Sequence, residues 1–355
     1  MIKISELRDE NKDRWDNFVQ KHKDARFYHL FGFKEVLEGL YRDRSFYLIV
    51  ENENGIIAVL PIFLVKTALF NKAVSLPFAE YAGILGGDLN DSEMKLLVNY
   101  LIDFLKERNV PYLEINGGLG LSEVLMRKFF QRLVFGQYAE LELTSIKDIW
   151  ENKLDGQVKK AIRKAKNFEI DFFEETSESS ISNYFYPLYL KSMKRKGSPA
   201  QSLKFFIDCY CHLGEYFKIF FVRDGEKITT ALQGYFTNKR VFIQHIVSEV
   251  DNFEKRPVDF IHWEFIKWAC ENGFKFFDFG MVRYEGQRRF KEKWGVKLSD
   301  YSYYYLLNPK MCNIIPKPIT PLSPKIVFLT KIWKRAMPQI VGNFIGPFIR
   351  AQLGK

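Results

Sequence analysis

The chain is poor in the residues that most often carry out chemistry by themselves. It has 4 cysteines and 5 histidines in 355 residues, and their spacing matches no zinc or redox motif, so we predict no metal site. The cysteines are Cys209, Cys211, Cys270 and Cys312. We expect them to be reduced, as in a cytoplasmic protein. A GxSxG elbow and a Walker loop are also missing, which argues against serine-hydrolase and P-loop chemistry.

Long apolar runs are missing as well. The first ten residues, MIKISELRDE, have no apolar centre and do not read as a signal peptide. The longest apolar run covers residues 55–65 and is interrupted by Pro61, whereas a membrane-spanning helix needs about 20 residues. We therefore expect a chain that does not span a membrane. It would lie in the cytoplasm, free or peripherally on the inner face of the membrane.

Positive charge and aromatic residues are abundant. Lys and Arg number 53 against 43 Asp and Glu, which gives a net charge of +10, and 47% of the residues are hydrophobic, with 34 Phe. This composition predicts a folded globular chain long enough for two domains. The positive charge favours an anionic partner: a phosphate-bearing co-substrate, RNA or an acidic membrane surface.

The expected elements occur twice in the same order. After a polar stretch (1–26) that we expect to be helical, the first half predicts helix 33–40, strands 46–50, 56–65 and 72–76, helix 93–108 and strand 112–115. The second half predicts helix 202–216, strands 218–222, 228–236 and 240–247, helix 258–272 and strand 274–280. The ends of the halves align as ERNVPYLEING and CENGFKFFDFG, which matches Glu114 to Asp278. This order indicates a duplicated α/β unit.

The second copy closes with the strand FKFFDFG and a basic segment, RYEGQRRFKEKWG, at residues 283–295. Large apolar and polar residues alternate in the strand, and we predict that it is buried. The segment after it reads as a loop in which Arg and Lys far outnumber Glu285 and Glu292. A rigid strand that delivers a basic loop can hold an anionic ligand, and an ordinary solvated charge run is the alternative.

Two other segments are basic on one face. Residues 157–167, QVKKAIRKAKN, predict a helix with a narrow apolar face, and its basic remainder is either a ridge for phosphates or a solvated surface. Beyond residue 308, five prolines up to Pro324 predict a semi-rigid connector, followed by a basic amphipathic helix at 325–336 that contains Trp333. This tail suits an anionic membrane surface, reached through residues 320–355, or it packs on the protein body.

Eight pieces of the chain, in this order, resemble the Fem-type aminoacyl/acyltransferases. They are Tyr28-His29…Phe33, AVLPIFLV (58–65), VSLPFAEYAGILGG (74–87), KKAIRKAK (159–166), RKGSP (195–199), FDFG (277–280), FKEKWG (290–295) and WKRAMP…IGPFIR…LG (333–354). The chain looks most like the FemAB-like proteins of bacterial exopolysaccharide and protein-sorting (PEP-CTERM) systems, within the acetyltransferase (GNAT) superfamily. The resemblance implies a mixed α/β fold of two tandem GNAT-like domains, residues 1–145 and 146–308, with a C-terminal amphipathic helical tail, residues 309–355.

The resemblance also implies an acyltransferase. It would form an amide on an amine of a peptidoglycan or exopolysaccharide precursor, a lipid- or nucleotide-linked sugar or peptide. The co-substrate would be an aminoacyl-tRNA or an acyl-CoA, with no tightly bound cofactor. The glycine-rich acetyl-CoA signature of ordinary GNAT enzymes and the long arm of larger Fem-type enzymes are both missing from this sequence. Two alternatives stay open: acyl-CoA-dependent N-acetylation of a small amine or amino sugar, and a non-catalytic protein of the membrane surface.

The resemblance assigns the donor side to the second half. By the FK motif, Lys291 would hold the donor end and stabilise charge during transfer. Other donor contacts would come from Arg283, Arg288, Lys293 and Arg256. Arg256 precedes Pro257, which suits the first turn of a helix whose N-terminus attracts anions, although a plain helix cap is the alternative. Phe290 and Trp294 are expected in the core.

Asp278 and the first half would serve the acceptor. Asp278 would orient the acceptor amine or accept its proton, and the alternative is a carboxylate that caps the backbone. By resemblance, the acceptor contacts would be Glu80, Tyr81, Lys34 and His29. A single histidine such as His29, His245 or His262 is more often structural.

Overall fold

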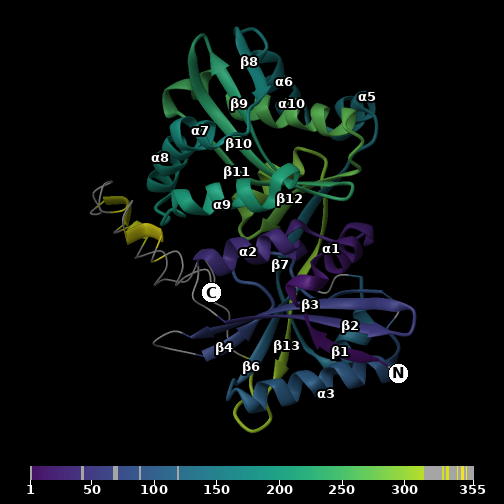
Figure 1. Cartoon of the computed structure of the whole chain (residues 1–355). Helices are drawn as coiled ribbons and strands as arrows, with labels where there is room; N and C mark the ends of the chain where they lie inside the picture. The colour runs from purple at the N-terminus through teal and green to yellow at the C-terminus, as the bar shows by residue number, and fades with distance from the viewer. Residues whose placement is uncertain are drawn as a thin grey trace. The chain divides into compact units, whose positions relative to one another are not determined.

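The computed structural model describes residues 2–40, 44–66, 71–87, 89–117 and 120–315, and in the tail 330, 331, 333–335, 342, 345–347 and 349 (Figure 1). The chain divides into two units. The first contains Met1–Gly136, Asp300–Pro318 and Gln352–Lys355, and the second contains Gln137–Ser299 and Ile319–Ala351. The division expected from the sequence, after residues 145 and 308, stays a prediction.

The sheet of the first unit has the strand order β1-β2-β3-β4-β6-β13, and β5 pairs with β3. The strands are β1 (Lys3–Glu6), β2 (Arg44–Asn52), β3 (Gly55–Lys66), β4 (Asn71–Val74), β5 (Leu85–Gly86), β6 (Tyr112–Asn116) and β13 (Lys297–Leu307). Neighbours are antiparallel except β4 and β6, which are parallel. β13 belongs to this unit from Asp300 onward.

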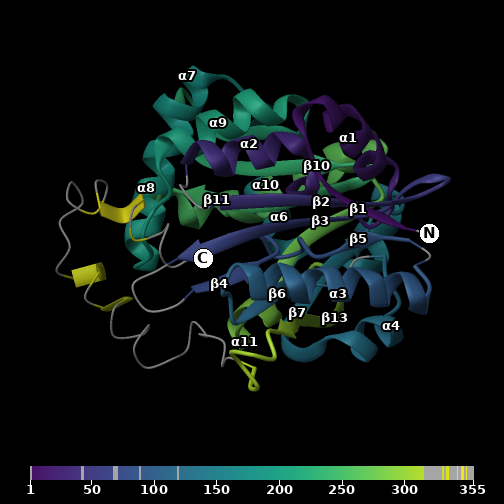
Figure 2. The same ribbon diagram turned by 60° about the horizontal axis from the view of Figure 1, so that its bottom comes forward.

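Helices cover both faces of this sheet. The helices are α1 (Lys12–Lys21), α2 (Phe31–Leu40), α3 (Asp91–Glu107) and α4 (Glu123–Phe129). Residues alternate along β2, so that Phe46 packs in the core with Phe104 of α3 while Tyr47 contacts Trp15 of α1 on the other face. Figure 2 shows α3 lying along its face of the sheet. Asn90 begins α3 by accepting a hydrogen bond from the Glu93 amide, and the Glu93 side chain accepts one in return.

The sheet of the second unit has the order β7-β12-β11-β10-β9-β8. The strands are β7 (Gln131–Glu142, in this unit from Gln137), β8 (Ile170–Glu174), β9 (Phe217–Asp224), β10 (Lys227–Thr237), β11 (Arg240–Ser248) and β12 (Phe276–Val282). Only β11 and β12 are parallel among the neighbours with described registers in this unit. Among the described strands, each unit therefore contains one parallel pair, formed by β4 and β6 or by β11 and β12.

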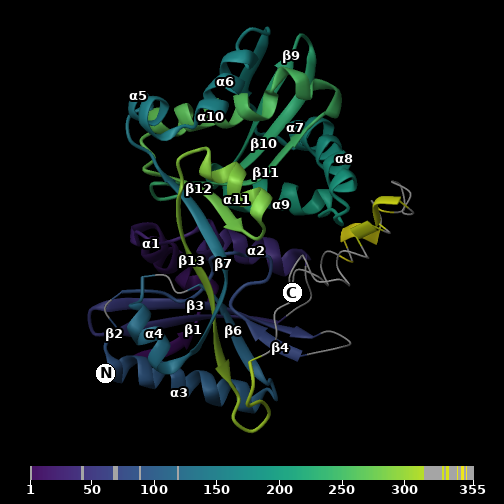
Figure 3. The same ribbon diagram turned by 180° about the vertical axis from the view of Figure 1, so that it is seen from behind.

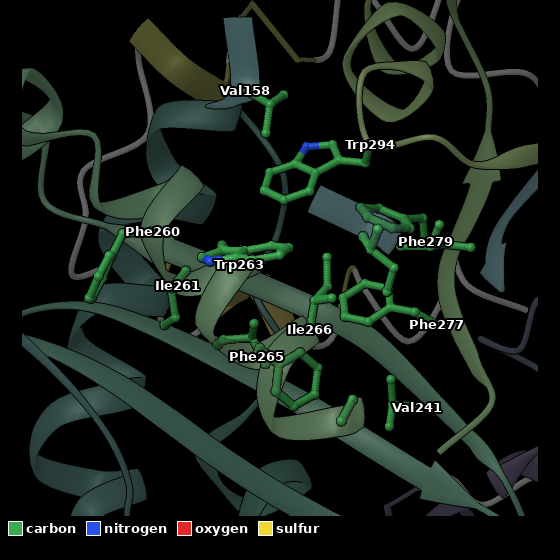
Figure 4. Packing of buried hydrophobic residues seen from close by; sticks show 14 of the residues in the cluster. Val158, Val241, Phe260, Ile261, Trp263, Phe265, Ile266, Phe277, Phe279 and Trp294 are labelled. Carbon is green, nitrogen blue, oxygen red and sulfur yellow. The ribbon is translucent and has the colours of Figure 1, made fainter. Parts of the chain in front are cut away.

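Helices also pack on both faces of the second sheet. They are α6 (Gly156–Ala165), α8 (Tyr186–Lys196), α9 (Leu203–Leu213), α10 (Pro257–Glu271) and α11 (Glu285–Glu292). Phe265 and Ile266 of α10 pack with Phe277 and Val241 of the strands, as Figure 4 shows. His245 of β11 faces the opposite side, where its ring lies against Tyr189 and Phe206 of α8 and α9. The shorter helical segments are η1 (Asp9–Asn11), η2 (Phe27–His29), α5 (Ile146–Asp148), η3 (Ile149–Lys153), α7 (Glu178–Ser180), η4 (Ile181–Phe185), η5 (Gly214–Tyr216) and η6 (Val250–Lys255).

Most predicted elements are confirmed, two expectations need correction, and some elements were missed. Residues 1–26 are not helical throughout, because β1 pairs with β2 before α1 begins. The basic segment after FDFG is a helix, α11, and not a loop; Figure 3 shows it following β12. Strands β1, β5, β7, β8 and β13 and helices α4 and α8 were not predicted.

The described residues of the tail pack on the second unit. Lys194 Nζ donates to the Trp333 carbonyl at 3.1 Å. Gly197 ends α8 with φ +71°, and a β-carbon there would lie 2.7 Å from Lys334 Cγ and 2.8 Å from Thr330 Cγ2. The packing alternative therefore holds for these residues. The rest of the predicted tail helix at 325–336 lies outside the described residues, and a membrane contact through residues 320–355 stays a prediction. A helix of membrane-crossing length and hydropathy does not occur in the described part of the chain.

Candidate active site

The parallel strands of the second unit separate soon after they meet. β11 and β12 pair from Arg240↔Phe276 to Phe242↔Asp278, and both strands then run on without pairing each other in the described register. β12 carries an extra residue at Phe279, and β11 carries one at Gln244. Bulges of this kind bend strands and often lie next to functional sites. The opening between β11 and β12 is therefore the candidate site, and we call it the second-unit opening.

Lys291 of α11 reaches the backbone of β12 beyond the last paired residue. Its Nζ donates to the carbonyls of Gly280 at 3.1 Å and Met281 at 2.7 Å, and the residue is 9% exposed. Gly280 has φ +70°, a left-handed conformation that favours glycine. The predicted donor lysine thus lies at the second-unit opening as a buried ammonium.

Asp278 is the last paired residue of β12 and is fully buried. Its Oδ1 accepts a hydrogen bond from the Gly280 amide at 2.8 Å. This is the capping role that the sequence left open as an alternative. Contact of Asp278 with an acceptor amine stays a prediction.

The other predicted donor residues lie on exposed faces of α11 and beside it. Arg288 pairs with Glu292 at 2.8 Å, and the side chains are exposed, so the pair contributes little stability. Arg283 is exposed too, and its amide donates to Gln287 Oε1 at 2.9 Å. Arg283 and Arg288 are therefore accessible to an anion.

A groove of about 470 Å³ lies beside α11. It is lined by Lys153, Leu154, Asp155, Arg289, Glu292 and Lys293. Lys293 Nζ donates to Gln157 Oε1 at 2.7 Å, which brings this predicted donor residue to the start of α6. Val158, Ala161, Ile162 and Ala165 of α6 are buried as predicted, and Lys160, Arg163, Lys164 and Lys166 are exposed. The groove and α6 together present more cations than carboxylates to solvent.

Arg256 precedes α10 and has φ +56°. Its Nε lies 3.1 Å from Asp259 Oδ2 in the first turn of the helix. Burial raises the pKa of Asp259, and the Arg256 charge opposes that rise. A carboxylate in the first turn already complements the positive end of the helix dipole. The diphosphate of coenzyme A therefore does not fit this helix end well, and the glycine-rich signature is also missing.

His262 of α10 packs beside the second-unit opening. Its ring stacks on Phe279 and Trp294 with centroids 5.9 and 5.0 Å away. Nδ1 lies 2.8 Å from the Val258 carbonyl. Burial lowers the pKa of His262 to about 4, so the ring is neutral near pH 7. Trp294 is fully buried as predicted, whereas Phe290 is 38% exposed.

The opening of the first unit is closed by the chain itself. β4 and β6 pair only at Ala73↔Leu113 and Val74↔Glu114. Beyond them, Asn116 Nδ2 donates to the carbonyls of Leu76 and Ala79, both at 3.2 Å, and the Asn116 carbonyl accepts from the Ala82 amide at 3.0 Å. The loop of residues 75–83 therefore occupies the edge of β6. The second-unit opening differs from this one, because the backbone of β12 at Gly280 and Met281 is bonded to the Lys291 ammonium and not to a loop.

Three of the predicted acceptor residues lie in or against this loop. Tyr81 packs on Tyr301 with centroids 4.8 Å apart, and the Glu80 carbonyl accepts a hydrogen bond from the Tyr301 hydroxyl. His29 is fully buried, and its Nε2 lies 3.1 Å from the Gly83 carbonyl. Burial lowers the pKa of His29 to about 4. His29 thus holds the loop from inside, while the Glu80 and Tyr81 side chains remain partly exposed.

The fourth acceptor candidate, Lys34, lies apart from the loop contacts. Its Nζ pairs with Glu38 at 2.7 Å along α2 and lies 5.0 Å from the centre of the Phe31 ring. The sequence reasoning also missed an ion pair between the buried Arg240 of β11 and the partly exposed Glu140 of β7. A signal was present, because Arg240 opens the otherwise apolar stretch VFI, in which charge is unexpected.

Residues 152–292 match the family model of an acetyltransferase (GNAT) domain. Among solved structures, FemX superposes with a TM-score of 0.69 at 12% identity, over 87% of this chain and 98% of that one. The C-terminal domain of a putative lysylphosphatidylglycerol synthetase from Agrobacterium fabrum gives 0.55 at 13%, over 83% and 91%. A tandem GNAT protein from the clavulanic acid biosynthesis pathway gives 0.52 at 8%, over 87% and 99%. Among curated protein sequences, none matches this chain.

These comparisons confirm two predictions. The fold is that of FemX and of a tandem GNAT protein, as the resemblance implied. The predicted enzyme class, an acyltransferase, is confirmed at the level of the matched domain.

Proposed function

We propose, from the premise that residues 152–292 are a GNAT acetyltransferase domain, that the chain forms an amide on an amine of a cell-envelope precursor. The acyl or aminoacyl group would come from an activated carrier held by the second unit. The observation that supports this most is the Lys291 ammonium on the Gly280 and Met281 carbonyls at the second-unit opening. Residues 75–83 fill the opening of the first unit, so a donor would not enter there. The first unit would therefore bind the acceptor.

In the proposed reaction the acceptor amine loses a proton and its lone pair attacks the acyl carbonyl carbon. A C–N bond forms, the C–O or C–S bond to the carrier breaks, and the carrier oxygen or sulfur leaves with a proton. Negative charge grows on the carbonyl oxygen during the attack. A buried ammonium such as Lys291 stabilises that charge more strongly than a solvated one does. Arg288 and Arg283 would attract the anionic carrier.

The structure gives a reason to favour one donor class. The helix end at Arg256 and Asp259 fits a coenzyme A diphosphate poorly. The groove beside α11 and the exposed cations of α6 suit an extended polyanion such as the acceptor end of an aminoacyl-tRNA. The second candidate is acyl-CoA-dependent N-acetylation of a small amine or amino sugar, which the family description favours.

The acceptor is proposed from the family resemblance and from the first-unit loop. It would be a lipid- or nucleotide-linked sugar or peptide, contacted by Glu80 and Tyr81. Peptidoglycan and exopolysaccharide precursors of this kind carry diphosphates, so Lys34 would add attraction. We place the reaction in the cytoplasm, at or near the inner face of the membrane.

The central test is the variant Lys291→Ala. We expect transfer of a labelled acyl group to fall by about 10²-fold or more, as happens when a charge-stabilising donor is removed. Lys204→Ala is the matched control, since Lys204 is a lysine of α9 with a 62% exposed side chain. Unchanged turnover by Lys291→Ala would refute the assignment of the site.

The donor class is tested separately by thermal stability. A ligand that binds the folded state raises the unfolding temperature. We expect stabilisation by tRNA and little by acetyl-CoA. Stabilisation by acetyl-CoA alone would favour the second candidate.

A further inference from the structure

Each unit carries polar side chains at the same three positions around its parallel pair. The first position is the last paired residue of β6 or β12. The second lies on the parallel neighbour, β4 or β11, two residues before the pairing ends. The third lies on the next strand, β13 or β7, directly opposite the first position. The positions hold Glu114, Lys72 and Tyr305 in the first unit, and Asp278, Arg240 and Glu140 in the second. An acid is thus present in both copies, whereas the third position carries a phenol in one unit and a carboxylate in the other.

In the first unit the acid is the centre of the contacts. Lys72 Nζ lies 3.3 Å from Glu114 Oε1, and the Tyr305 hydroxyl donates to Glu114 Oε2 at 3.1 Å. The cation therefore stays with the acid of the neighbouring strand.

In the second unit the cation reaches one strand further. The Arg240 guanidinium is in direct contact with the Glu140 carboxylate of β7, having crossed β12 at 4.6 Å from the centre of the Phe276 ring. Arg240 is 8% exposed and the Glu140 side chain is 26% exposed, so the guanidinium is buried and its carboxylate partner is partly open to solvent. Glu140 therefore draws the cation to β7, while Asp278 Oδ1 accepts from the Gly280 amide.

We propose that Glu140 is a positioning residue of the transfer site. Glu140 keeps the Arg240 guanidinium at β7, so that Asp278 keeps its hydrogen bond from the Gly280 amide. The Gly280 carbonyl in turn accepts a hydrogen bond from the Lys291 ammonium. The inference rests on the proposed function, in which Lys291 stabilises the developing charge. Removal of the Glu140 charge leaves a buried guanidinium without this carboxylate, which is costly. The carboxylate directly opposite is Asp278, so the guanidinium would turn to it and draw it from Gly280.

The test is a double-mutant cycle with Glu140→Gln and Arg240→Gln. We expect Glu140→Gln to lower kcat by about tenfold or more, because small displacements of a charge-stabilising group are costly. The double variant Glu140→Gln/Arg240→Gln should recover kcat to within about threefold of the original, since the displaced cation is gone. Glu140→Asp should retain most activity. A pair that is merely structural would give a double variant no better than Glu140→Gln, and that result would overturn the proposal.

Tyr305→Phe is the control in the first unit. It removes the corresponding contact there and should lower thermal stability without the kcat loss.

The remaining outcomes are distinguishable. If Glu140→Gln alone does not fold, the double variant decides: near-original kcat supports the proposal and a tenfold loss overturns it. If Lys291→Ala loses transfer while Glu140→Gln does not, this inference fails and the proposed function stands. If Lys291→Ala keeps full transfer, the proposed function itself fails.

Discussion

Asp278 and Lys291 form hydrogen bonds with the backbone of the same residue, Gly280, one with its amide and the other with its carbonyl. Asp278 Oδ1 accepts from the Gly280 amide at 2.8 Å, and Lys291 Nζ donates to the Gly280 carbonyl at 3.1 Å. The two side chains lie on different elements, β12 and α11. The position of the Lys291 ammonium therefore depends on the Asp278 carboxylate through Gly280.

This relationship separates the two roles considered for Asp278. Asp278→Asn keeps an oxygen that can accept from the Gly280 amide, so under the capping role we expect transfer to stay within about threefold of the original. Asp278→Ala removes the acceptor and should cost about tenfold or more, because Gly280 and Lys291 shift. The measurement is kcat for acyl transfer by both variants.

The alternative role gives the opposite pattern for one variant. If Asp278 takes the proton of the acceptor amine, Asp278→Asn should lose as much activity as Asp278→Ala, because an amide is not a base at this pH. Circular dichroism and unfolding temperature would show whether each variant is folded, so that a loss of activity can be assigned to chemistry.

The buried histidines predict how stability depends on pH. His262 has a pKa of about 4 in the folded chain against 6.5 for the free side chain, so the unfolded chain binds more protons between these values. The stability from this site is complete above pH 6.5 and is lost as the pH falls toward 4. Between pH 7 and pH 5 we expect His262 to lower the free energy of unfolding by about 2 kcal/mol.

Urea unfolding at the two pH values measures this contribution. His262→Gln should make the difference in free energy smaller by that amount, whereas His212→Gln, at an exposed position of α9, should leave it unchanged. His29 is buried with a similarly lowered pKa, so it should account for a further part of the difference. An equal difference in the original chain and His262→Gln would contradict the burial argument.

The closed opening of the first unit predicts an effect on the acceptor. Asn116→Ala removes the donor to the Leu76 and Ala79 carbonyls, and we expect a loss of about 2 kcal/mol in the free energy of unfolding. The loop that carries Glu80 and Tyr81 should loosen. In the transfer assay the KM for the acceptor should rise several-fold while kcat changes little. Asn99→Ala, at an exposed position of α3, is the control. A kcat loss with unchanged acceptor KM would contradict an acceptor role for this loop.

The repeat was predictable from local patterns because most of its strands and helices have regular periodicity. Apolar runs on either side of a turn identified the strands now seen as β2 and β3, and alternation identified β12. The aligned copies correctly matched Glu114 to Asp278. β13 escaped because it is defined by pairing with β6, far away in the sequence. Helix α11 was not predicted because its only buried residue is a lysine, Lys291, so its sequence does not show the apolar face of an amphipathic helix.

The candidate site was predictable in part. The FK motif indicated Lys291, and the structure places it at the second-unit opening. The unexpected charge of Arg240 was visible in the sequence, but its partner Glu140 could not be predicted, because the pair depends on the register of three strands and crosses one of them. The closing of the first-unit opening was equally hidden, since it rests on side-chain bonds of Asn116 to loop carbonyls.

The tail can be tested with two glycines that share a backbone conformation. Gly197 has φ +71° and is crowded by Thr330 and Lys334. Gly225 has φ +59°, and a β-carbon added there would have no heavy atom of the described residues within 4 Å, its chain neighbours aside. Gly225→Ala should cost about 1 kcal/mol for strain alone. Gly197→Ala should cost more, because the tail residues must also move.

The difference between the two variants therefore measures how firmly the tail is docked. We expect it to exceed about 1 kcal/mol in the full chain and to vanish when residues 320–355 are deleted, as measured by urea unfolding. Anionic liposomes offer the competing surface: flotation that requires residues 320–355 would show that the tail can leave the body. If Gly197→Ala then increases flotation while Gly225→Ala does not, docking and membrane binding compete for the same segment. Equal costs for the two glycine variants in the full chain would contradict docking at Gly197.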